Sequence, residues 1–248
     1  MFDFHTHILP GIDDGSSSAE ESLRMLNELK LQGVEGIAAT PHFYAEQSSP
    51  TDFFARRRRA WEQLKPHLTP DLPEIRLGAE VRYFEGINQC DGLEQFCIEG
   101  TDLLLLEMPH GVWTRRMIAA LAELSGRGNI TLLLAHVERY LRRQKKETWN
   151  DLLRCGIRMQ VSADFFVKRG SRRTAMKLLR DGRIHLLGTD CHNMTSRKPN
   201  MGDAVSVIQH KSGDELLQRI TNREHMLLQT AAQTDDLICS AGIGGGLT

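Results

Sequence analysis

Short apolar runs alternate with longer amphipathic segments along the chain. Seven runs have the length and apolar character of buried strands, and they occupy residues 1–7, 34–42, 75–83, 102–110, 130–140, 157–164 and 184–192. Segments with apolar residues at helical spacing lie between most of them, at 19–33, 50–68, 115–128 and 171–183. This alternation predicts an α/β fold with a parallel sheet, either open and doubly wound or closed into a barrel.

The alternation continues without a break in composition, which predicts one domain instead of two. We place this domain at residues 1–230. Residues 231–248 include the glycine-rich sequence SAGIGGGLT, which predicts a flexible C-terminal tail.

Composition and charge narrow the function classes. The chain has 248 residues, of which 40% are hydrophobic and 25% charged, as in ordinary soluble globular proteins. Its 31 basic and 32 acidic residues nearly balance, so nothing predicts bulk attraction to nucleic acid or to an anionic membrane. No apolar run is long enough to span a bilayer, and the N-terminus lacks a signal-peptide pattern. We therefore expect a cytoplasmic protein.

The number and spacing of the cysteines also favour a cytoplasmic protein. There are five, an odd number without any C-x-x-C pair, which argues against a disulfide framework or a structural zinc site. We expect reduced thiols.

Six of the seven predicted strands end in side chains that can bind a metal ion. These are His5, His7, His42, Glu80, Glu107, His136, Asp190 and His192. His5 and His7 share a face, because alternate residues of a strand point the same way. The carboxyl ends of parallel strands gather at one face of the fold, so we expect all eight side chains to converge.

Eight nitrogen and oxygen donors exceed the needs of a mononuclear site, so the sequence predicts two or three cations. Asp14, in the loop after the first strand, is a ninth candidate, although Asp13-Asp14-Gly15 also has the pattern of a turn before a capped helix. The remaining histidines are expected to have surface or structural roles: His67, His110, His185, His210 and His225.

Grouped metal ions make hydroxide from water near neutral pH and stabilise an in-line phosphoryl displacement, so we expect a hydrolase. Arg139 and Arg197 follow ligand-bearing strand ends, and their planar guanidinium groups suit phosphate oxygens. We expect both to bind substrate phosphate.

The arginine run at 56–59 predicts a solvated helix face, with docking of an acidic partner or an oligomer contact as the alternative.

Six segments resemble, in order, the motifs of the PHP (polymerase and histidinol phosphatase) superfamily: FHTHILPGIDDG, ATPH, GAEVRY, LLLLEMP, LLLAHVERY and GTDCHN. More narrowly, DDGSSSAEESLRM, AHVERY and a D-x-H-N sequence followed by an arginine resemble the bacterial protein-tyrosine phosphatases linked to capsular or exopolysaccharide synthesis. The resemblance extends from Met1 to the region of Arg223, which is essentially the full domain.

The resemblance implies a distorted (β/α)7 barrel, TIM-like, with a trinuclear centre that is commonly manganese-dependent; iron and zinc are alternatives. One metal ion would be held by His5, His7, Glu80 and Asp190, a second by Asp14, His42 and His192, and the third by Glu80, Glu107 and His136, with Glu80 as the bridge. Arg139 and Arg197 match the arginines that bind the substrate phosphate. The implied partner is a phosphotyrosine protein, such as a bacterial tyrosine kinase.

Other hypotheses stay open at this point. Cys191 to Arg197 has the C-x5-R spacing of cysteine-dependent tyrosine phosphatases, but this loop lacks the glycines that let a backbone curl around phosphate. The same metal ions could serve a small-molecule phosphomonoesterase such as a histidinol-phosphate phosphatase. A non-enzymatic, metal-stabilised regulatory module is a third hypothesis, although such a module would be expected to have lost ligands. The sequence also leaves a homo-oligomer open.

Overall fold

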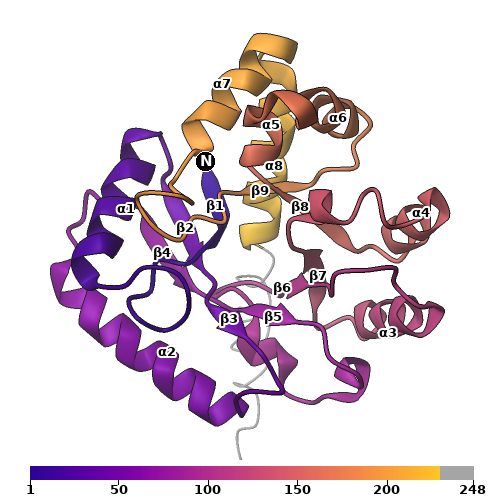
Figure 1. The fold of residues 1–248 in the computed structure, drawn as a ribbon, viewed down its shortest axis with the longest axis horizontal. Helices are drawn as coiled ribbons and strands as arrows, with labels where there is room; N and C mark the ends of the chain where they lie inside the picture. The colour runs from indigo at the N-terminus through magenta and orange to yellow at the C-terminus, as the bar shows by residue number, and fades with distance from the viewer. Residues whose placement is uncertain (230–248) are drawn as a thin grey trace, which may run out of the picture.

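A curled parallel sheet lies at the centre of the molecule, with helices around its outside (Figure 1). The computed structural model describes residues 1–229, and the predicted tail at 231–248 lies outside the described residues. The strands are β1 Phe2–Thr6, β2 Gly36–Ala39, β3 His42–Phe43, β4 Glu74–Leu77, β5 Glu80–Arg82, β6 Leu103–Glu107, β7 Thr131–Leu134, β8 Arg158–Ser162 and β9 Leu186–Gly188. They pair in the orders β1-β2-β4 and β3-β5-β6-β7-β8-β9, and every pair is parallel. The predicted parallel α/β fold is confirmed.

The second and third predicted strands are each interrupted. The second forms β2 and β3 around Pro41, and the third forms β4 and β5 around Gly78. Proline has no N–H for the ladder, so it interrupts regular pairing. The N–H of Gly78 still donates to the carbonyl of Ala39 (2.9 Å), and the N–H of Glu80 donates to the carbonyl of Pro41 (3.0 Å). The sheet therefore continues across both interruptions.

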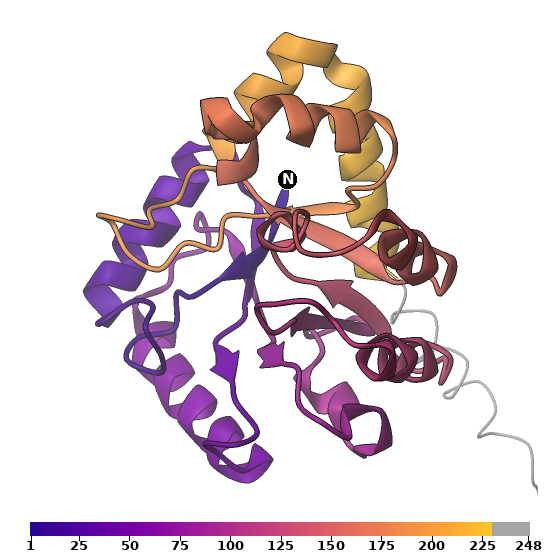
Figure 2. The same ribbon diagram turned by 45° about the vertical axis from the view of Figure 1, so that its right-hand side comes forward.

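Backbone hydrogen bonds also join the first strand to the segment that follows the last one. The N–H of His7 donates to the carbonyl of Cys191 (2.9 Å), and the N–H of Asp190 donates to the carbonyl of His5 (2.8 Å). A parallel bridge links Thr6 to Cys191. The curl of the sheet thus brings β1 next to β9, as Figure 2 shows.

Helices surround the sheet, and the first three begin at residues that supply capping groups. The helices are α1 Ala19–Leu31, α2 Pro50–Leu64, α3 Arg115–Ser125, α4 Lys146–Arg154, α5 Asp164–Val167, α6 Arg169–Arg180, α7 Met201–Ser212 and α8 Asp214–Gln229. Short 3-10 turns are η1 Lys65–His67, η2 Ile87–Gln89, η3 Leu93–Phe96 and η4 Val137–Arg139. The side chains of Ser18, Ser49 and Thr114 accept hydrogen bonds from the first-turn N–H groups of α1, α2 and α3. No helix within residues 1–229 is long and apolar enough to cross a membrane.

Strand β6 is apolar on both faces, because one face lines the interior of the curled sheet and the other packs under the helices. In β6, Leu103 and Leu105 belong to one buried cluster, whereas Leu104 and Leu106 belong to another. This is the alternation expected of a strand. The first cluster also contains Phe2 and fills the interior near the strand starts, which leaves the strand ends for polar side chains.

The arginine run at 56–59 lies on the outer helix α2. Arg57 donates to the carbonyl of Gly78 (2.8 Å) and lies over the ring of Phe54, 4.9 Å from its centre. Arg58 pairs with Glu62 at 3.5 Å. The helix face that carries the arginine run is therefore solvated, and some of its arginines form ion pairs or hydrogen bonds. This agrees with the solvated face that the sequence predicts.

Candidate metal centre

All nine predicted ligand residues come together at the carboxyl ends of the strands. Single donor atoms from these side chains fall into four groups in which all atoms lie within 4.8 Å of one another. The groups are His7, Asp14, His42 and His192; His5, His7 and Asp190; His5, Glu80 and His136; and His42, Glu80 and Glu107. Convergence from seven separate segments is what parallel strand ends predict.

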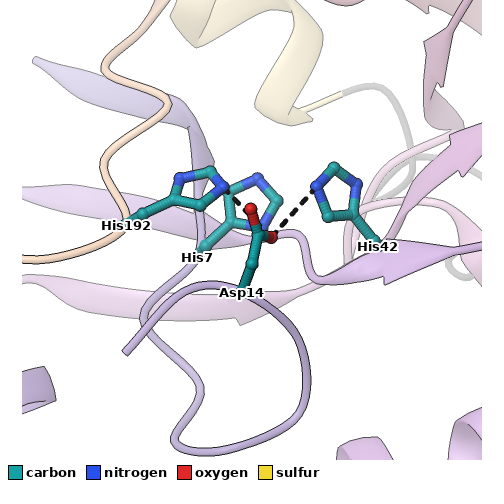
Figure 3. Close-up of side chains that lie close together, drawn as sticks. All are labelled: His7, Asp14, His42 and His192. Carbon is teal, nitrogen blue, oxygen red and sulfur yellow. Dashed lines mark ion pairs between the residues drawn. The ribbon is translucent and has the colours of Figure 1, made fainter. Parts of the chain in front are cut away.

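The first group includes the loop residue Asp14 (Figure 3). Its Oδ1 lies 3.4 Å from Nε2 of His42 and 3.4 Å from Nε2 of His192, which come from opposite ends of the chain. The Asp14 side chain is 63% exposed, whereas that of His192 is 1% exposed. Asp14 therefore covers the buried imidazoles from the solvent side.

In the second group, two imidazole nitrogens face each other. Nε2 of His5 lies 3.0 Å from Nε2 of His7, and Oδ1 of Asp190 lies 3.6 and 3.5 Å from these atoms. Two nitrogen lone pairs at this distance repel unless a proton or a cation lies between or beside them. The carboxylate of Asp190 supplies the negative charge that a shared cation requires.

Glu80 occupies the middle of the cluster. Its Oε2 lies 2.9 Å from Nδ1 of His42 and 3.2 Å from Nε2 of His5, and its Oε1 lies 2.8 Å from Nε2 of His136. The side chain is 1% exposed. Two oxygens directed at different imidazoles are the geometry that a bridging carboxylate needs.

The expected third set of Glu80, Glu107 and His136 is divided between two groups. Oε1 of Glu107 lies 3.8 Å from Nε2 of His136, but Glu107 is grouped with His42 and Glu80, whereas His136 is grouped with His5 and Glu80. The reason is strand register, because Glu107 pairs with Arg82, two residues beyond Glu80 on β5. Its carboxylate consequently enters the cluster further along the sheet.

Two of the predicted ligand residues have an unusual backbone. His136 has φ of 33° and Asp190 has φ of 55°, and they are the positive-φ residues other than glycine in the described chain. A left-handed conformation costs a non-glycine residue free energy and is concentrated at functional sites. In both places the chain leaves a strand abruptly, which turns the side chain toward the centre.

Asp13 supports the centre, although its sequence pattern suggested only a turn. Its Oδ2 accepts hydrogen bonds from Nδ1 of His7 (2.8 Å) and from the backbone N–H of His42 (3.0 Å). The next turn requires Gly15, because a Cβ there would lie 2.2 Å from the carbonyl oxygen of His7. One signal for this role was present in the sequence, a carboxylate close to a predicted histidine ligand. Metal-binding histidines usually donate their other N–H to a carboxylate or carbonyl.

Gln160 is a second residue that the sequence pattern did not single out. Its Oε1 accepts a hydrogen bond from the backbone N–H of His136 (2.6 Å) and lies 3.5 Å from Nδ1 of His5. Gly188 on β9 makes room for both side chains, because a Cβ there would lie 2.6 Å from Cβ of His5 and 2.7 Å from Nε2 of Gln160. Gln160 belongs to the one predicted strand without a ligand, so no pattern marked it.

The electrostatics keep Glu80 charged, whereas burial and the charge of Glu80 raise the pKa of Glu107. Burial by itself would raise the pKa of Glu80, but the charge of His5 and hydrogen bonds from His136 and His42 hold it well below its usual range. Burial opposes the charge of His7 as well, yet Asp13 and Glu80 raise the pKa of His7 to about 10. By contrast, burial and the neighbouring His7 lower the pKa of His192 to about 4. The charged carboxylate of Glu80 therefore lies in the middle of the cluster, where it attracts cations.

The donor set fits divalent metal ions. Nδ1 of His7 bonds Asp13, and Nδ1 of His192 lies 3.0 Å from the carbonyl of Asp190, so each ring directs Nε2 toward the centre. Within residues 1–229, Nε2 of His192 is buried without a hydrogen-bond partner. Mixed imidazole and carboxylate ligands with such supporting contacts suit manganese, iron or zinc.

Arg139 and Arg197 lie beside these ligands. The guanidinium of Arg139 contacts Oδ2 of Asp190, and Nη2 of Arg197 lies 2.6 Å from Oδ1 of the same carboxylate. Nη1 of Arg197 also lies 3.7 Å from Oδ2 of Asp14. Both side chains are about one-third exposed, at 35% and 37%. They therefore border both the metal cluster and solvent.

The structure disfavours a cysteine nucleophile. Cys191 is fully buried and belongs to the hydrophobic core, and burial together with the charge of Asp3 raises the pKa of its thiol. A reactive thiolate instead needs an electropositive, partly exposed position. Within residues 1–229 the cysteines Cys90, Cys97, Cys155 and Cys191 are free thiols, as the sequence predicts.

Comparison with known proteins agrees with this geometry. The family model for capsular polysaccharide synthesis proteins of the CpsB/CapC type matches residues 1–228. The chain is 28% identical over 239 residues to the tyrosine-protein phosphatase YwqE of Bacillus subtilis, covering 92% of each chain. It is also 28% identical over 225 residues to the tyrosine-protein phosphatase CpsB of Streptococcus pneumoniae, covering 86% of this chain and 91% of the relative.

One similar solved structure comes from crystal structures of YwqE and CpsB, described as unique metal-dependent tyrosine phosphatases. It superposes with a TM-score of 0.80 at 26% identity, and the match covers 92% of this chain and 94% of the other. The resemblance found in the sequence motifs is thereby confirmed at the level of family and fold.

Proposed function

The chain belongs to the CpsB/CapC family of capsular polysaccharide synthesis proteins, and we propose that it is a metal-dependent tyrosine-protein phosphatase. One observation carries this function: nine imidazole and carboxylate side chains converge on a buried cluster with two arginines at its edge. The relatives are named for the same activity. A regulatory module without activity would have no need for all nine positions.

In this proposal, the nine convergent residues would hold two or three divalent cations, and Glu80 would contribute to more than one of the sites. When bound, such ions lower the pKa of water and polarise the phosphoryl oxygens. Asp13 keeps the Nδ1 proton of His7 in a hydrogen bond, so that Nε2 is free as a ligand. Gln160 holds the backbone at His136, where the chain bends toward the cluster.

Arg139 and Arg197 bind the substrate phosphate. Arg139 donates to Asp190 and Arg197 forms an ion pair with it, and their remaining N–H groups are available to phosphoryl oxygens at the edge of the cluster. A planar fork of donors stabilises the charge that develops on these oxygens during displacement. The leaving phenolate has a pKa near ~10, so it departs without a strong general acid.

Manganese is the proposed metal. The ligands are nitrogen and oxygen donors without thiolate, and carboxylate-rich sites of this kind accept manganese, with iron or zinc as competitors.

The proposed partner is a phosphotyrosine protein, a tyrosine kinase that regulates capsule or exopolysaccharide synthesis. The family name for capsular polysaccharide synthesis supports this partner. A cytoplasmic location stays a prediction from the sequence.

We also interpret the fold as a distorted seven-stranded βα barrel. The support is that β2 with β3, and β4 with β5, each form one interrupted strand, and that His7 and Cys191 bond across the join between β1 and β9.

The proposed function is tested by hydrolysis of p-nitrophenyl phosphate and of a phosphotyrosine peptide. We expect activity to disappear after chelation, to return with Mn²⁺, and to fall by about 10³-fold or more in His5→Ala, because a ligand is lost. Cys191→Ser is expected to stay within about threefold of the wild type, since this thiol is fully buried in the hydrophobic core and is not reactive. If activity instead persisted without metal and Cys191→Ser abolished it, the metal-dependent mechanism would be wrong and Cys191 would be the nucleophile.

A further inference from the structure

A cleft of about 900 Å³ adjoins the metal centre on the side of the two arginines. Its walls come from the loop after η4, from α5 and the start of α6, and from the loop before α7. Arg139, Asp190 and Arg197 form the end nearest to the ligands. The cleft therefore begins where the phosphate arginines lie and extends away from the metal cluster.

The cleft is larger than one phosphorylated tyrosine side chain requires. Pockets for drug-sized ligands span roughly 300–1,000 Å³, and this one lies near the upper end of that range. Leu141, Phe165 and Val167 add apolar surface to its lining. The space beyond the phosphate arginines can accordingly accept residues next to a phosphotyrosine.

Its lining is more basic than the chain as a whole. Six cationic side chains contribute: Arg139, Arg142, Arg143, Lys168, Arg197 and Lys198. Four acidic side chains also contribute: Glu138, Asp164, Asp190 and Asp203. The chain itself has a net charge of −1, so this excess of positive charge is local.

Three of the four acidic side chains already form ion pairs or hydrogen bonds within the protein. Asp190 is held by both arginines, and Asp164 pairs with Lys168 at 2.5 Å. Glu138 accepts from the backbone N–H of Ser162 at 3.3 Å. In the described part of the chain, Arg142, Arg143 and Lys198 are exposed and form no ion pair. These three cations are free to bind an anionic group on a substrate.

We propose that the cleft binds acidic residues that flank the phosphotyrosine, so that the preferred substrate is an acidic phosphotyrosine segment. This inference rests on the proposed phosphatase function and specifies its substrate class. The free cations are single charges on exposed side chains, which suits separate carboxylates along an extended peptide. A second phosphate would instead favour several donors converging on one buried point.

The test compares kcat/KM for three peptides with the Mn²⁺-loaded enzyme: one with Asp and Glu flanking the phosphotyrosine, one with Asn and Gln instead, and one neutral peptide with a second phosphotyrosine. Arg142→Gln/Arg143→Gln removes two free cations. Arg58→Gln/Arg59→Gln is the matched control, because these arginines are exposed on α2, on the far side of the molecule from α5 and α6 (Figure 1).

We expect the wild type to prefer the acidic peptide over the neutral one by about fivefold or more, since each exposed charge pair contributes up to about fivefold. The preference should fall several-fold in Arg142→Gln/Arg143→Gln, and in the wild type as salt rises, while Arg58→Gln/Arg59→Gln keeps the wild-type ratio. The salt series needs no variant, so it stands even if a double variant folds poorly.

Equal rates on the acidic and neutral peptides would overturn the inference and leave the phosphatase function standing. A preference for the doubly phosphorylated peptide alone would also overturn it. If the wild type hydrolysed neither p-nitrophenyl phosphate nor any peptide, the proposed function itself would fail.

Discussion

His7 is held from both sides of its ring. Nδ1 bonds the carboxylate of Asp13 at 2.8 Å, and Nε2 faces His5 at 3.0 Å inside the cluster. The hydrogen bond to Asp13 fixes which nitrogen carries the proton and therefore which one can bind a metal ion. Asp13 is thus a positioning residue for a ligand.

The substitution Asp13→Asn should weaken metal binding. The amide keeps the size of the side chain but removes the charge that orients His7, and losses at such supporting positions are typically about 10- to 100-fold in metal affinity. Equilibrium dialysis with Mn²⁺ measures this directly. Asp91→Asn, at an exposed position, is the control and should bind metal like the wild type. Unchanged affinity in Asp13→Asn would contradict the supporting role.

The convergence of the nine predicted ligand residues was predictable from the sequence, because eight of them follow or end a recognisable apolar strand. The supporting residues were not. Asp13 and Gln160 act through hydrogen bonds whose partners depend on the path of a loop and on the register of neighbouring strands. Neither of these is encoded in a local pattern.

At the scale of elements, the close approach of β1, β8 and β9 positions His5. Gly188 on β9 lies against His5 and Gln160, and an added Cβ would come within 2.6 and 2.7 Å of their side-chain atoms. Overpacking at such a site costs about 1–3 kcal/mol, because neighbouring groups in a buried strand cannot move away freely.

Gly188→Ala should therefore lower the free energy of unfolding by about 1–3 kcal/mol and weaken Mn²⁺ binding, because His5 is displaced. Denaturant unfolding of the chelated protein and metal dialysis give the two readouts. Gly170→Ala on α6 is the matched control, since a Cβ there has open space, and it should be neutral or slightly stabilising. If Gly188→Ala had the same free energy of unfolding as the wild type, Gly188 would not be closely packed against His5 and Gln160.

The elements also show the limit of sequence patterns. The seven predicted apolar segments all contain strands, but Pro41 and Gly78 divide two of them. The apolar runs continue through these residues, so hydrophobic pattern alone gives no boundary there. The pairing that bridges the interruptions, such as Glu80 to Pro41, depends on the neighbouring strand.

At the scale of the whole molecule, the last described helix is tied to the first strand. The N–H of Phe2 donates to Oε2 of Glu224 at 3.1 Å across 222 residues of sequence. Glu224 on α8 is only 2% exposed, and burial raises its pKa to about 7. Its protonated form is therefore favoured by folding, and the stability it contributes is lost as the pH rises from about 4.5 through about 7.

Glu224→Gln keeps an acceptor for Phe2 but removes this titration. Its free energy of unfolding relative to the wild type should increase between pH 5 and pH 8, by roughly 1–3 kcal/mol, because only the wild type must bury a carboxylate at high pH. Denaturant unfolding of the chelated proteins across this range measures the difference. The exposed variant Glu46→Gln should give a flat difference. A flat profile for Glu224→Gln as well would contradict the assignment.

In the proposed function, one multinuclear metal centre, built from nearly the whole length of the chain, hydrolyses phosphotyrosine. The most direct measurement is a titration of the chelated protein with Mn²⁺ in which bound metal and hydrolysis of a phosphotyrosine peptide are followed together. We predict that two or three equivalents bind per chain and that activity rises only as more than one equivalent is bound. Full activity with no metal, or with a single equivalent, would rule out a multinuclear catalytic centre.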